Sequence, residues 1–357
     1  VINKRIKLIM AFTTINKSTD HFNTKLYTGT GSSNAITGVG FQPDWVWIKN
    51  RSSGSLGHQA FDVLRGVTKR IFPNDAAAEE TDANALTAFG SDGFTVGSNT
   101  GVNASGNNIV AWNWKGGGSG STNNDGATAS TVSANQTAGF SIVKHAGSGS
   151  ATTIGHGLGA SPKIIITKAL DVLNSWIFQQ NILGGSWTSS NYLILNSTAA
   201  AASSSTIINN VNNSTISFAG SNDWVNSSSY NYVHYCFAEK TGYSKFGSYT
   251  ANGSADGTFV FTGFAPKFII MKRTDTGGYN WVMYDDKRNT YNPWTNLLLP
   301  NLTNAEITSG GAIDFLSNGF KLRSSSGANP TTNQGTIIYM AFGQSLVGTN
   351  NIPATAR

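Results

Sequence analysis

The segment Pro43-Asp-Trp-Val-Trp-Ile-Lys49 is the first of three similar segments in the chain. The other two are Pro162-Lys-Ile-Ile-Ile-Thr-Lys168 and Pro266-Lys-Phe-Ile-Ile-Met-Lys272. Each contains a continuous run of β-branched and aromatic residues, which is typical of a central strand buried on both faces. Proline stands at the start of the strand, where its missing N–H costs least. The sequence therefore predicts one buried strand that occurs three times.

Two further patterns accompany this strand. Ser91-Asp-Gly-Phe-Thr-Val-Gly97 matches Ser317-Asn-Gly-Phe-Lys-Leu-Arg323, and Asp-Gly and Asn-Gly are strong hairpin-turn pairs. A closing apolar run then occurs at residues 109–114, 232–237 and 337–342. Alternation along a strand places the large side chains of each closing run on one face, which we expect to face the core. These side chains are Val110, Trp112 and Trp114, then Val233, Tyr235 and Phe237, then Ile338, Met340 and Phe342.

Length and composition agree with an all-β protein. The chain has 357 residues with 40 glycines, and only 12% of its residues are charged, which argues against a helical bundle. Aromatic residues make up 11%, enough to form a core and to exclude disorder. A repeat of about 100 residues with many short strands has the size of a β-sandwich. We predict three tandem antiparallel β-sandwich repeats.

The boundaries of these repeats follow from glycine-rich and serine-rich stretches. The segment after residue 116 reads Gly-Gly-Ser-Gly-Ser-Thr-Asn-Asn-Asp-Gly and predicts a flexible linker. We expect an N-terminal extension and lead-in at 1–25, repeats at 26–116, 139–240 and 245–345, the linker at 117–138, and a C-terminal tail at 346–357. Residues 1–9 are expected to lie outside the fold, before Met10.

Charge and cysteine content narrow the function classes. Three of the basic residues behind the net charge of +6 lie within residues 1–9, and no basic run follows, so no nucleic-acid partner is expected. No stretch approaches the ~18 consecutive apolar residues of a transmembrane helix, so no membrane insertion is expected. Cys236 is the single cysteine, so the chain has no internal disulfide.

The sequence does not indicate catalysis. None of the five histidines forms a metal-binding pair, and no phosphate-binding loop is present, so we expect no metal and no cofactor, with a loop-bound calcium ion left open. The acidic pairs Glu79-Glu80 and Asp285-Asp286 do not occur in the other repeats. An active site carried by each repeat would occur in each repeat. We therefore expect no enzyme, and a glycan-degrading alternative would use Asp285 or Asp286.

Aromatic residues in turn-rich stretches are the candidate binding residues. Trp224 and Tyr230 stand among Asn, Asp and Ser, and Tyr279 follows two glycines. An aromatic face beside amides and hydroxyls suits a sugar, although loop aromatics often fold back onto a sandwich.

One polar feature is present in all three repeats, the lysine that ends each proline-led segment. Two interpretations remain open for it: a side chain that extends from a buried strand end to solvent and pairs with a carboxylate or carbonyl, or a contact with a ligand or a neighbouring subunit. The lysines are Lys49, Lys168 and Lys272.

Several of these segments resemble a family of repeat proteins in marine bacteriophages, including those of Pelagibacter-like hosts and cyanobacteria. The similarity spans residue 10 to the end and is carried by residues 10–18, 26–31, 40–49, 91–97, 246–257 and 347–357. It implies a virion structural or tail-fibre protein with concanavalin-like or SPRY-like jelly-roll domains. The family brings no established catalytic or binding residues.

Together these observations predict a protein of the virion surface, made in the host cytoplasm. We expect a tail fibre or similar appendage that binds host-surface glycans without catalysis. The alternative is a capsid-decorating or spacer protein that makes only subunit contacts. Expected partners are further copies of the chain, most simply as a trimer, other virion proteins and host-surface polysaccharide.

Overall fold

A computed structural model describes residues 13–184, 187, 191–309, 311–325 and 335–347. Helix within these residues is limited to the 3-10 turn η1 (Ser18–Asp20) and α1 (Thr100–Asn103). All paired strands named below are antiparallel, which confirms the predicted all-β sandwich class.

The strands fall into three segments that we call unit 1 (residues 22–114), unit 2 (121–237) and unit 3 (244–345). Unit 1 contains β1 (Phe22–Thr28), β2 (Asn34–Thr37), β3 (Trp45–Asn50), β4 (Gln59–Asp62), β5 (Lys69–Arg70), β6 (Glu80–Thr81), β7 (Leu86–Gly90), β8 (Gly93–Val96) and β9 (Asn108–Trp114). Unit 2 contains β10 (Ser121–Asn123), β11 (Ser130–Asn135), β12 (Phe140–Ala146), β13 (Thr152–Gly155), β14 (Ile164–Ala169), β15 (Ile177–Gln180), β16 (Asn191–Ile194), β17 (Ala202–Ser203), β18 (Ile208–Val211), β19 (Thr215–Phe218) and β20 (Asn231–Phe237). Unit 3 contains β21 (Ser244–Thr250), β22 (Phe259–Phe261), β23 (Phe264–Arg273), β24 (Val282–Asp285), β25 (Ile313–Leu316), β26 (Gly319–Leu322) and β27 (Thr336–Ser345).

One strand order occurs in all three units. Unit 1 has a four-stranded sheet β1-β9-β3-β4 and a three-stranded sheet β2-β8-β7. Unit 3 has the matching sheets β21-β27-β23-β24 and β22-β26-β25. Unit 2 has β12-β20-β14-β15 within an eight-stranded sheet, and the small sheet β13-β19-β18. The three proline-led segments of the sequence form the equivalent strands β3, β14 and β23.

Each unit has its own apolar core between its two sheets. In unit 1 the small side chain of Ala111 on β9 and Ile48 on β3 pack with Phe94 and Val96 of β8. Corresponding clusters fill units 2 and 3. The less bulky face of each closing strand is therefore the one inside the sandwich.

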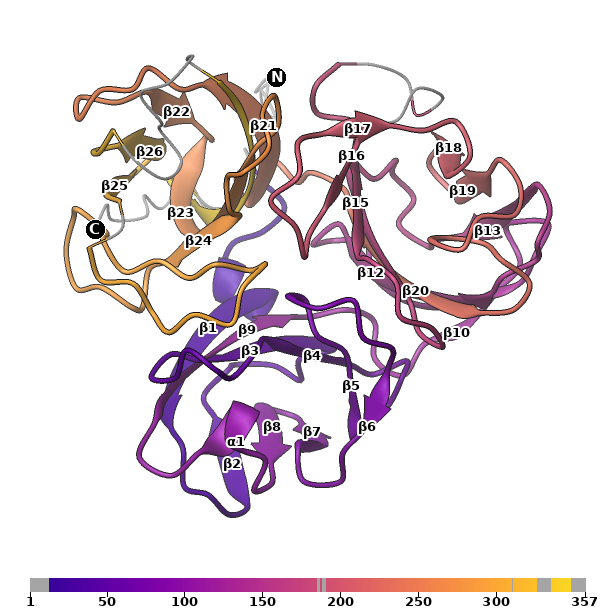
Figure 1. Cartoon of the computed structure of the whole chain (residues 1–357), viewed down its shortest axis with the longest axis horizontal. Coiled ribbons are helices and arrows are strands. Elements are labelled where there is room, and N and C mark those ends of the chain that lie inside the picture. Colours follow the sequence, from indigo (N-terminus) through magenta and orange to yellow (C-terminus); the bar gives the residue numbers. More distant parts are fainter. Residues whose placement is uncertain (1–12, 185–186, 188–190, 310, 326–334, 348–357) are drawn as a thin grey trace, which may run out of the picture.

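The bulky face of each closing strand meets the other two units at the centre of the molecule. Trp112, Tyr235 and Met340 occupy equivalent positions on β9, β20 and β27, and all three belong to one buried cluster, which we call the central cluster. Ring contacts join the units pairwise: Trp45 stacks on Tyr235 with centroids 4.3 Å apart, and Phe22 lies 5.4 Å from Phe268. Figure 1 shows the three units arranged around this centre.

The three units pack on one another through these faces. The bulky face of each closing strand is apolar and points away from its own sandwich, so a sandwich alone would expose that face to water. The three units bury that face against one another. They form one body with a shared core.

Two predicted boundaries differ in the structure. The expected linker at 117–138 contains β10 and β11, which extend the large sheet of unit 2 beyond β12. The expected lead-in at 1–25 includes part of β1 and Ile15, which belongs to the central cluster. Residues 1–12, and 348–357 of the expected tail, lie outside the described residues.

Candidate functional site

The aromatic residues chosen from the sequence lie in two separate places. Trp224 and Tyr230 share the loop between β19 and β20, and both are half-buried. The Trp224 ring packs on Tyr192 at 5.3 Å between centroids and on the core of unit 2. Tyr279 lies in unit 3, between β23 and β24. No described contact joins it to the other two, so the three residues do not form one site in this structure.

Tyr279 takes part in contacts that hold its own loop. The guanidinium of Arg273 lies over its ring, 4.5 Å from the centroid. Its backbone oxygen accepts a hydrogen bond from the Lys272 ammonium at 2.7 Å. Gly278, the residue before it, donates its N–H to Thr198 of unit 2. The loop is therefore part of a boundary between units.

The three recurrent lysines are buried, and their ammonium groups bind backbone carbonyls. Lys168 Nζ donates to Ala76 O of unit 1 at 3.0 Å and to Asn174 O at 2.8 Å, and Lys272 Nζ donates to Thr198 O of unit 2 at 3.2 Å. Lys49 binds carbonyls of its own loop, among them Leu56 O at 2.8 Å. Burial lowers the pKa of all three to about 8. Two of these lysines thus tie their unit to a neighbouring one, and none extends to solvent.

A second set of contacts repeats around the molecule at the residue before each fourth strand. The indole N–H of Trp176 donates to Phe72 O of unit 1 at 2.8 Å. The indole N–H of Trp281 donates to Ile194 O of unit 2 at 3.0 Å. His58 Nε2 lies 3.1 Å from Leu299 O of unit 3. Each unit therefore contacts a backbone carbonyl of another unit in the same way, and the three boundaries close a ring.

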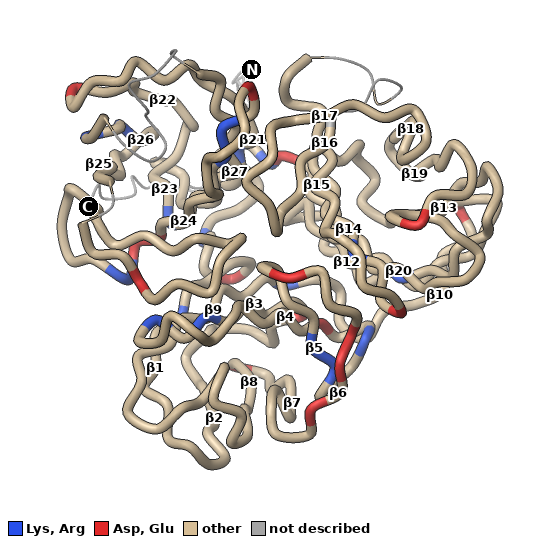
Figure 2. The backbone as a smooth tube through the Cα atoms, viewed as in Figure 1, with Lys and Arg blue, Asp and Glu red and all other residues tan. Residues whose placement is uncertain are grey.

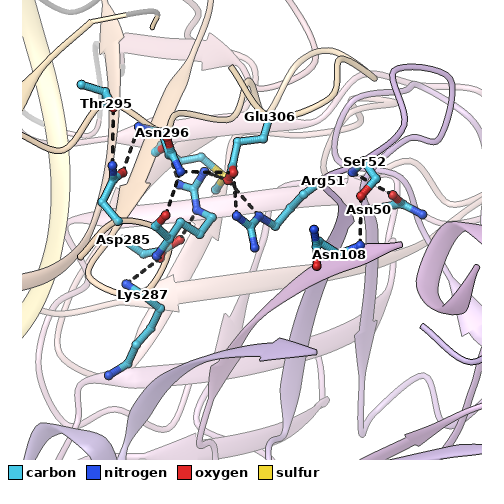
Figure 3. A network of polar contacts seen from close by, with 12 residues as sticks. Asn50, Arg51, Ser52, Asn108, Asp285, Lys287, Thr295, Asn296 and Glu306 are labelled. Atoms are coloured by element: carbon cyan, nitrogen blue, oxygen red, sulfur yellow. Dashed lines mark hydrogen bonds and ion pairs between the residues drawn. The ribbon is translucent and has the colours of Figure 1, made fainter. Parts of the chain in front are cut away.

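Asp285, one of the two acidic residues suggested for a glycan-degrading activity, lies in an ion-pair network between units 1 and 3 (Figure 3), whereas Asp286 pairs with Lys267 of its own unit at 2.8 Å. Glu306 accepts two hydrogen bonds from Arg51 of unit 1 at 2.6 and 2.9 Å and one from Arg288 at 3.0 Å. Asp285 is 1% exposed, and its Oδ2 accepts from Arg288 Nε at 2.6 Å and from the Trp112 indole at 3.0 Å. These carboxylates are bound by cations inside the molecule. We use the name clasp for a buried carboxylate that accepts hydrogen bonds from an arginine of its own unit and from an aromatic residue of another unit, here Asp285 with Arg288 and Trp112.

The same clasp occurs between units 1 and 2. Asp62 Oδ2 accepts from the Tyr235 hydroxyl at 2.7 Å and is paired with Arg65, whose other partner is Glu79. The side chains of Asp62 and Arg65 are fully buried. Charged residues are otherwise thinly spread, with basic and acidic positions interspersed (Figure 2).

The third boundary has a neutral version of the clasp. Gln180 occupies the position in unit 2 that Asp62 occupies in unit 1. Asp62 pairs with the first residue of β3, and Gln180 pairs with the first residue of the equivalent strand β14. Its Oε1 accepts hydrogen bonds from the backbone N–H groups of Ile182 and Leu183 at 2.6 and 3.2 Å. Asp62 Oδ1 likewise accepts from the N–H groups of the residues two and three positions after it. Leu183 replaces the arginine, and Met340 replaces the aromatic donor. The boundary between units 2 and 3 therefore has no buried ion pair at this position.

A polar groove with a volume of about 470 Å³ lies on unit 2. Its lining comes from residues within 117–125 and 132–136, together with the turns at 157–159 and 213–214. The first two segments form β10, β11 and their connections, the stretch that the sequence predicted as a linker. Sequence reasoning missed this groove because four chain segments build it together.

The groove is lined by neutral polar groups. Its polar side chains are Ser119, Ser121, Asn123, Asp125, Gln136, Asn213 and Ser214, and Asp125 is the one charged residue among the lining residues. Some amides are already oriented: Gln136 Nε2 donates to Gly157 O at 2.9 Å. Gly157 has a φ of +70°, and an added Cβ would lie 2.9 Å from Val132 Cγ1. Glycine therefore allows this turn to pack closely against β11.

The chemistry of this groove is hydrogen bonding to an uncharged ligand. Amide and hydroxyl groups both donate and accept, which suits a ligand rich in hydroxyl groups. A single carboxylate and no cation in the lining disfavour phosphate, sulfate or uronate groups. In the part of the chain that the structure describes, no group of three His, Cys, Asp or Glu side chains is placed to hold a metal ion. No helix of the described residues is long and apolar enough to cross a membrane.

Comparison with known proteins adds a family. A family of unknown function, DUF7483, matches residues 17–345. The chain belongs to this family. Its match begins before β1 and ends with β27, so it covers all three units and the central cluster apart from Ile15. No curated protein and no solved structure matches the chain.

Proposed function

We propose that the chain is a non-catalytic carbohydrate-binding protein that holds a neutral polysaccharide in the groove of unit 2. The observation that carries this proposal is the lining of the groove, in which amides, hydroxyls and glycines surround a single carboxylate. The shallow and polar shape supports binding of a chain that lies across the surface. The rigid β-sheet beneath it supports a preformed site, which reduces the entropy cost of binding.

We also propose, on the resemblance to marine phage proteins, that the chain is a virion-surface appendage of the tail-fibre kind. A surface with few charges changes little with salt and pH, which suits a particle exposed to seawater. Its partners would then be host-surface polysaccharide and other virion proteins. No step of bond cleavage belongs to this function.

The test uses two substitutions on neighbouring residues of β10. Ser121 lines the groove, whereas Thr122 lines a hollow that includes Leu64 and Lys144. Successive strand residues point to opposite faces, and both are exposed, so the two substitutions place the same ring on opposite faces of β10. Ser121→Trp fills the groove, and Thr122→Trp is the matched control.

Binding is measured by affinity electrophoresis in gels that contain neutral or acidic polysaccharides. We expect wild-type retardation by a neutral polysaccharide, unchanged by added salt, a loss of tenfold or more in Ser121→Trp, and no change in Thr122→Trp. Retardation by acidic polysaccharides alone, or equal loss in both variants, contradicts the groove as the site. Binding to purified capsids with no polysaccharide binding favours the capsid-decorating alternative.

A further inference from the structure

An exposed aromatic edge strand on unit 3 is a docking surface that the groove does not explain. In β22, Phe259 is 46% exposed and Phe261 is 64% exposed, whereas Val260 between them is buried. The two rings therefore lie on the outer face of the small sheet of unit 3. The strand β22 itself lies on the outer side of the molecule (Figure 1). In the equivalent strand of unit 1, the exposed positions are Ala35 and Thr37. Unit 3 therefore has an exposed aromatic pair that unit 1 lacks.

The backbone of this strand is also unpaired on one side. β22 is the first strand of the sheet β22-β26-β25, so it has β26 on one edge and no strand on the other among the described residues. Thr258 O accepts from Leu322 N, and Thr262 N donates to Asn318 O, so even-numbered residues direct their backbone groups to β26. The N–H and C=O groups of Phe259 and Phe261 then point to the open edge.

An open edge with two exposed rings is a combination that natural proteins avoid unless a partner covers it. Unit 2 covers the equivalent strand: Thr128 forms a parallel bridge to Ile154 of β13 and donates its N–H to Thr153 O. In unit 3 no described segment does so.

We propose that β22 pairs antiparallel with β22 of a second copy of this chain. A two-fold axis at Val260 places Phe259 opposite the Phe261 of the second copy, and the reverse. Because these residues direct both backbone groups to the open edge, each opposed pair exchanges two hydrogen bonds, four in all. The same register sets two rings of each copy side by side on one face, where aromatic cross-strand pairs stabilise a sheet. A strand with an aromatic residue on each side of its central residue is complementary to itself under this symmetry.

The area of the contact sets its strength. A fully buried phenylalanine covers about 150–250 Å², so the exposed fractions give on the order of 200 Å² from the two rings of one copy. A stable interface buries about 800 Å² on each partner. The rings supply about a quarter of that area, so the dimer is weak and forms at micromolar concentration or above. This pairing is two-fold, in contrast to the trimer expected from the sequence.

Sedimentation velocity over about 1–200 μM tests the proposal on the full chain. We expect the wild type to shift from monomer to dimer across this range. Phe259→Thr/Phe261→Thr, which keeps strand propensity and removes the rings, should remain monomeric. Phe261→Pro should also remain monomeric, because it removes an outward N–H while leaving the bonds to β26 in place. Tyr291, another residue of unit 3, is 80% exposed, and Tyr291→Thr is the matched control that should dimerise like the wild type.

Three outcomes would overturn the proposal: a wild type that is monomeric throughout, a dimer that persists in the double variant, or a trimer. Circular dichroism of each variant shows whether it is folded, and a second double variant, Phe259→Val/Phe261→Val, replaces the first if the first is unfolded. Polysaccharide binding measured on the same variants keeps this test separate from the proposed function, because the groove lies on unit 2.

Discussion

Removal of the Tyr235 hydroxyl tests whether the contact between units 1 and 2 contributes to the free energy of unfolding. Asp62 Oδ2 accepts from Tyr235 at 2.7 Å and from Arg65 Nε, and its other oxygen accepts two backbone N–H groups at 3.0 and 2.9 Å. In Tyr235→Phe the ring remains, so no cavity forms in the central cluster. What is lost is one buried hydrogen bond to a carboxylate.

The expected cost is about 1.5–3 kcal/mol, the usual contribution of a hydrogen bond to a charged group. We expect a cost in the upper part of this range, because no water can replace the hydroxyl at a fully buried carboxylate. The free energy of unfolding is measured in urea by tryptophan fluorescence and by circular dichroism. Tyr243→Phe is the control, since Tyr243 lies in the same cluster and no described hydrogen bond engages its hydroxyl. It should change the free energy of unfolding by less than about 0.5 kcal/mol.

A double-mutant cycle with Asp62→Asn isolates the contact between the two units. We expect a coupling of at least about 1 kcal/mol between the two changes, since the side chains share one hydrogen bond. A loss below about 0.5 kcal/mol in Tyr235→Phe, equal to that of the control, would refute the reasoning that the clasp links units 1 and 2.

Two further predictions concern the core and the buried lysines. Trp45→Ala should lower the free energy of unfolding by about 3–5 kcal/mol, because Trp45 contacts rings of units 1 and 2. Backbone hydrogen exchange should then become faster in all three units. Faster exchange confined to unit 1 would contradict a shared core. Burial lowers the pKa of Lys49, Lys168 and Lys272 from 10.5 to about 8, so between pH about 8 and 10 the unfolded chain binds more protons than the folded chain and the free energy of unfolding should rise with pH. Lys168→Met should make this rise smaller in urea titrations at pH 8 and 9.5, and a rise of unchanged size in the variant would count against the lowered pKa.

The closing strands and their bulky faces could be predicted from the sequence because they depend on local pattern. Alternation placed Trp112, Tyr235 and Met340 on the face turned toward a core, and all three lie in the central cluster. What lies opposite that face could not be predicted, because alternation distinguishes the two faces of a strand but does not say which other surface covers each. A sandwich interior and a boundary between units are both apolar. The shared core therefore required the tertiary structure.

The groove and the aromatic edge were missed for different reasons. The stretch 117–138 has the composition of a linker, and the one signal for β11 is the weak alternation of Val132 and Ala134 between polar residues. The edge was visible as Phe259-Val-Phe261, but this pattern predicts that the phenylalanines face inward, and the structure buries the valine. Which face of an edge strand is buried depends on the sheet that it joins.

Comparison of the three boundaries shows that the residues of the clasp differ together. Where Asp62 is present, Tyr235 supplies a donor and an arginine supplies the counter-charge. Where Gln180 replaces the aspartate, Leu183 and Met340 replace the arginine and the donor. An aspartate without the arginine would be a buried unpaired charge, and an arginine without the aspartate would be another, each of them strongly destabilising. The neutral boundary keeps the two backbone hydrogen bonds and the apolar contact while it avoids both. A chain of three independent sandwiches would place no such constraint on residues from two different units, so the matched changes in Gln180 and Met340 follow from a core that all three units share.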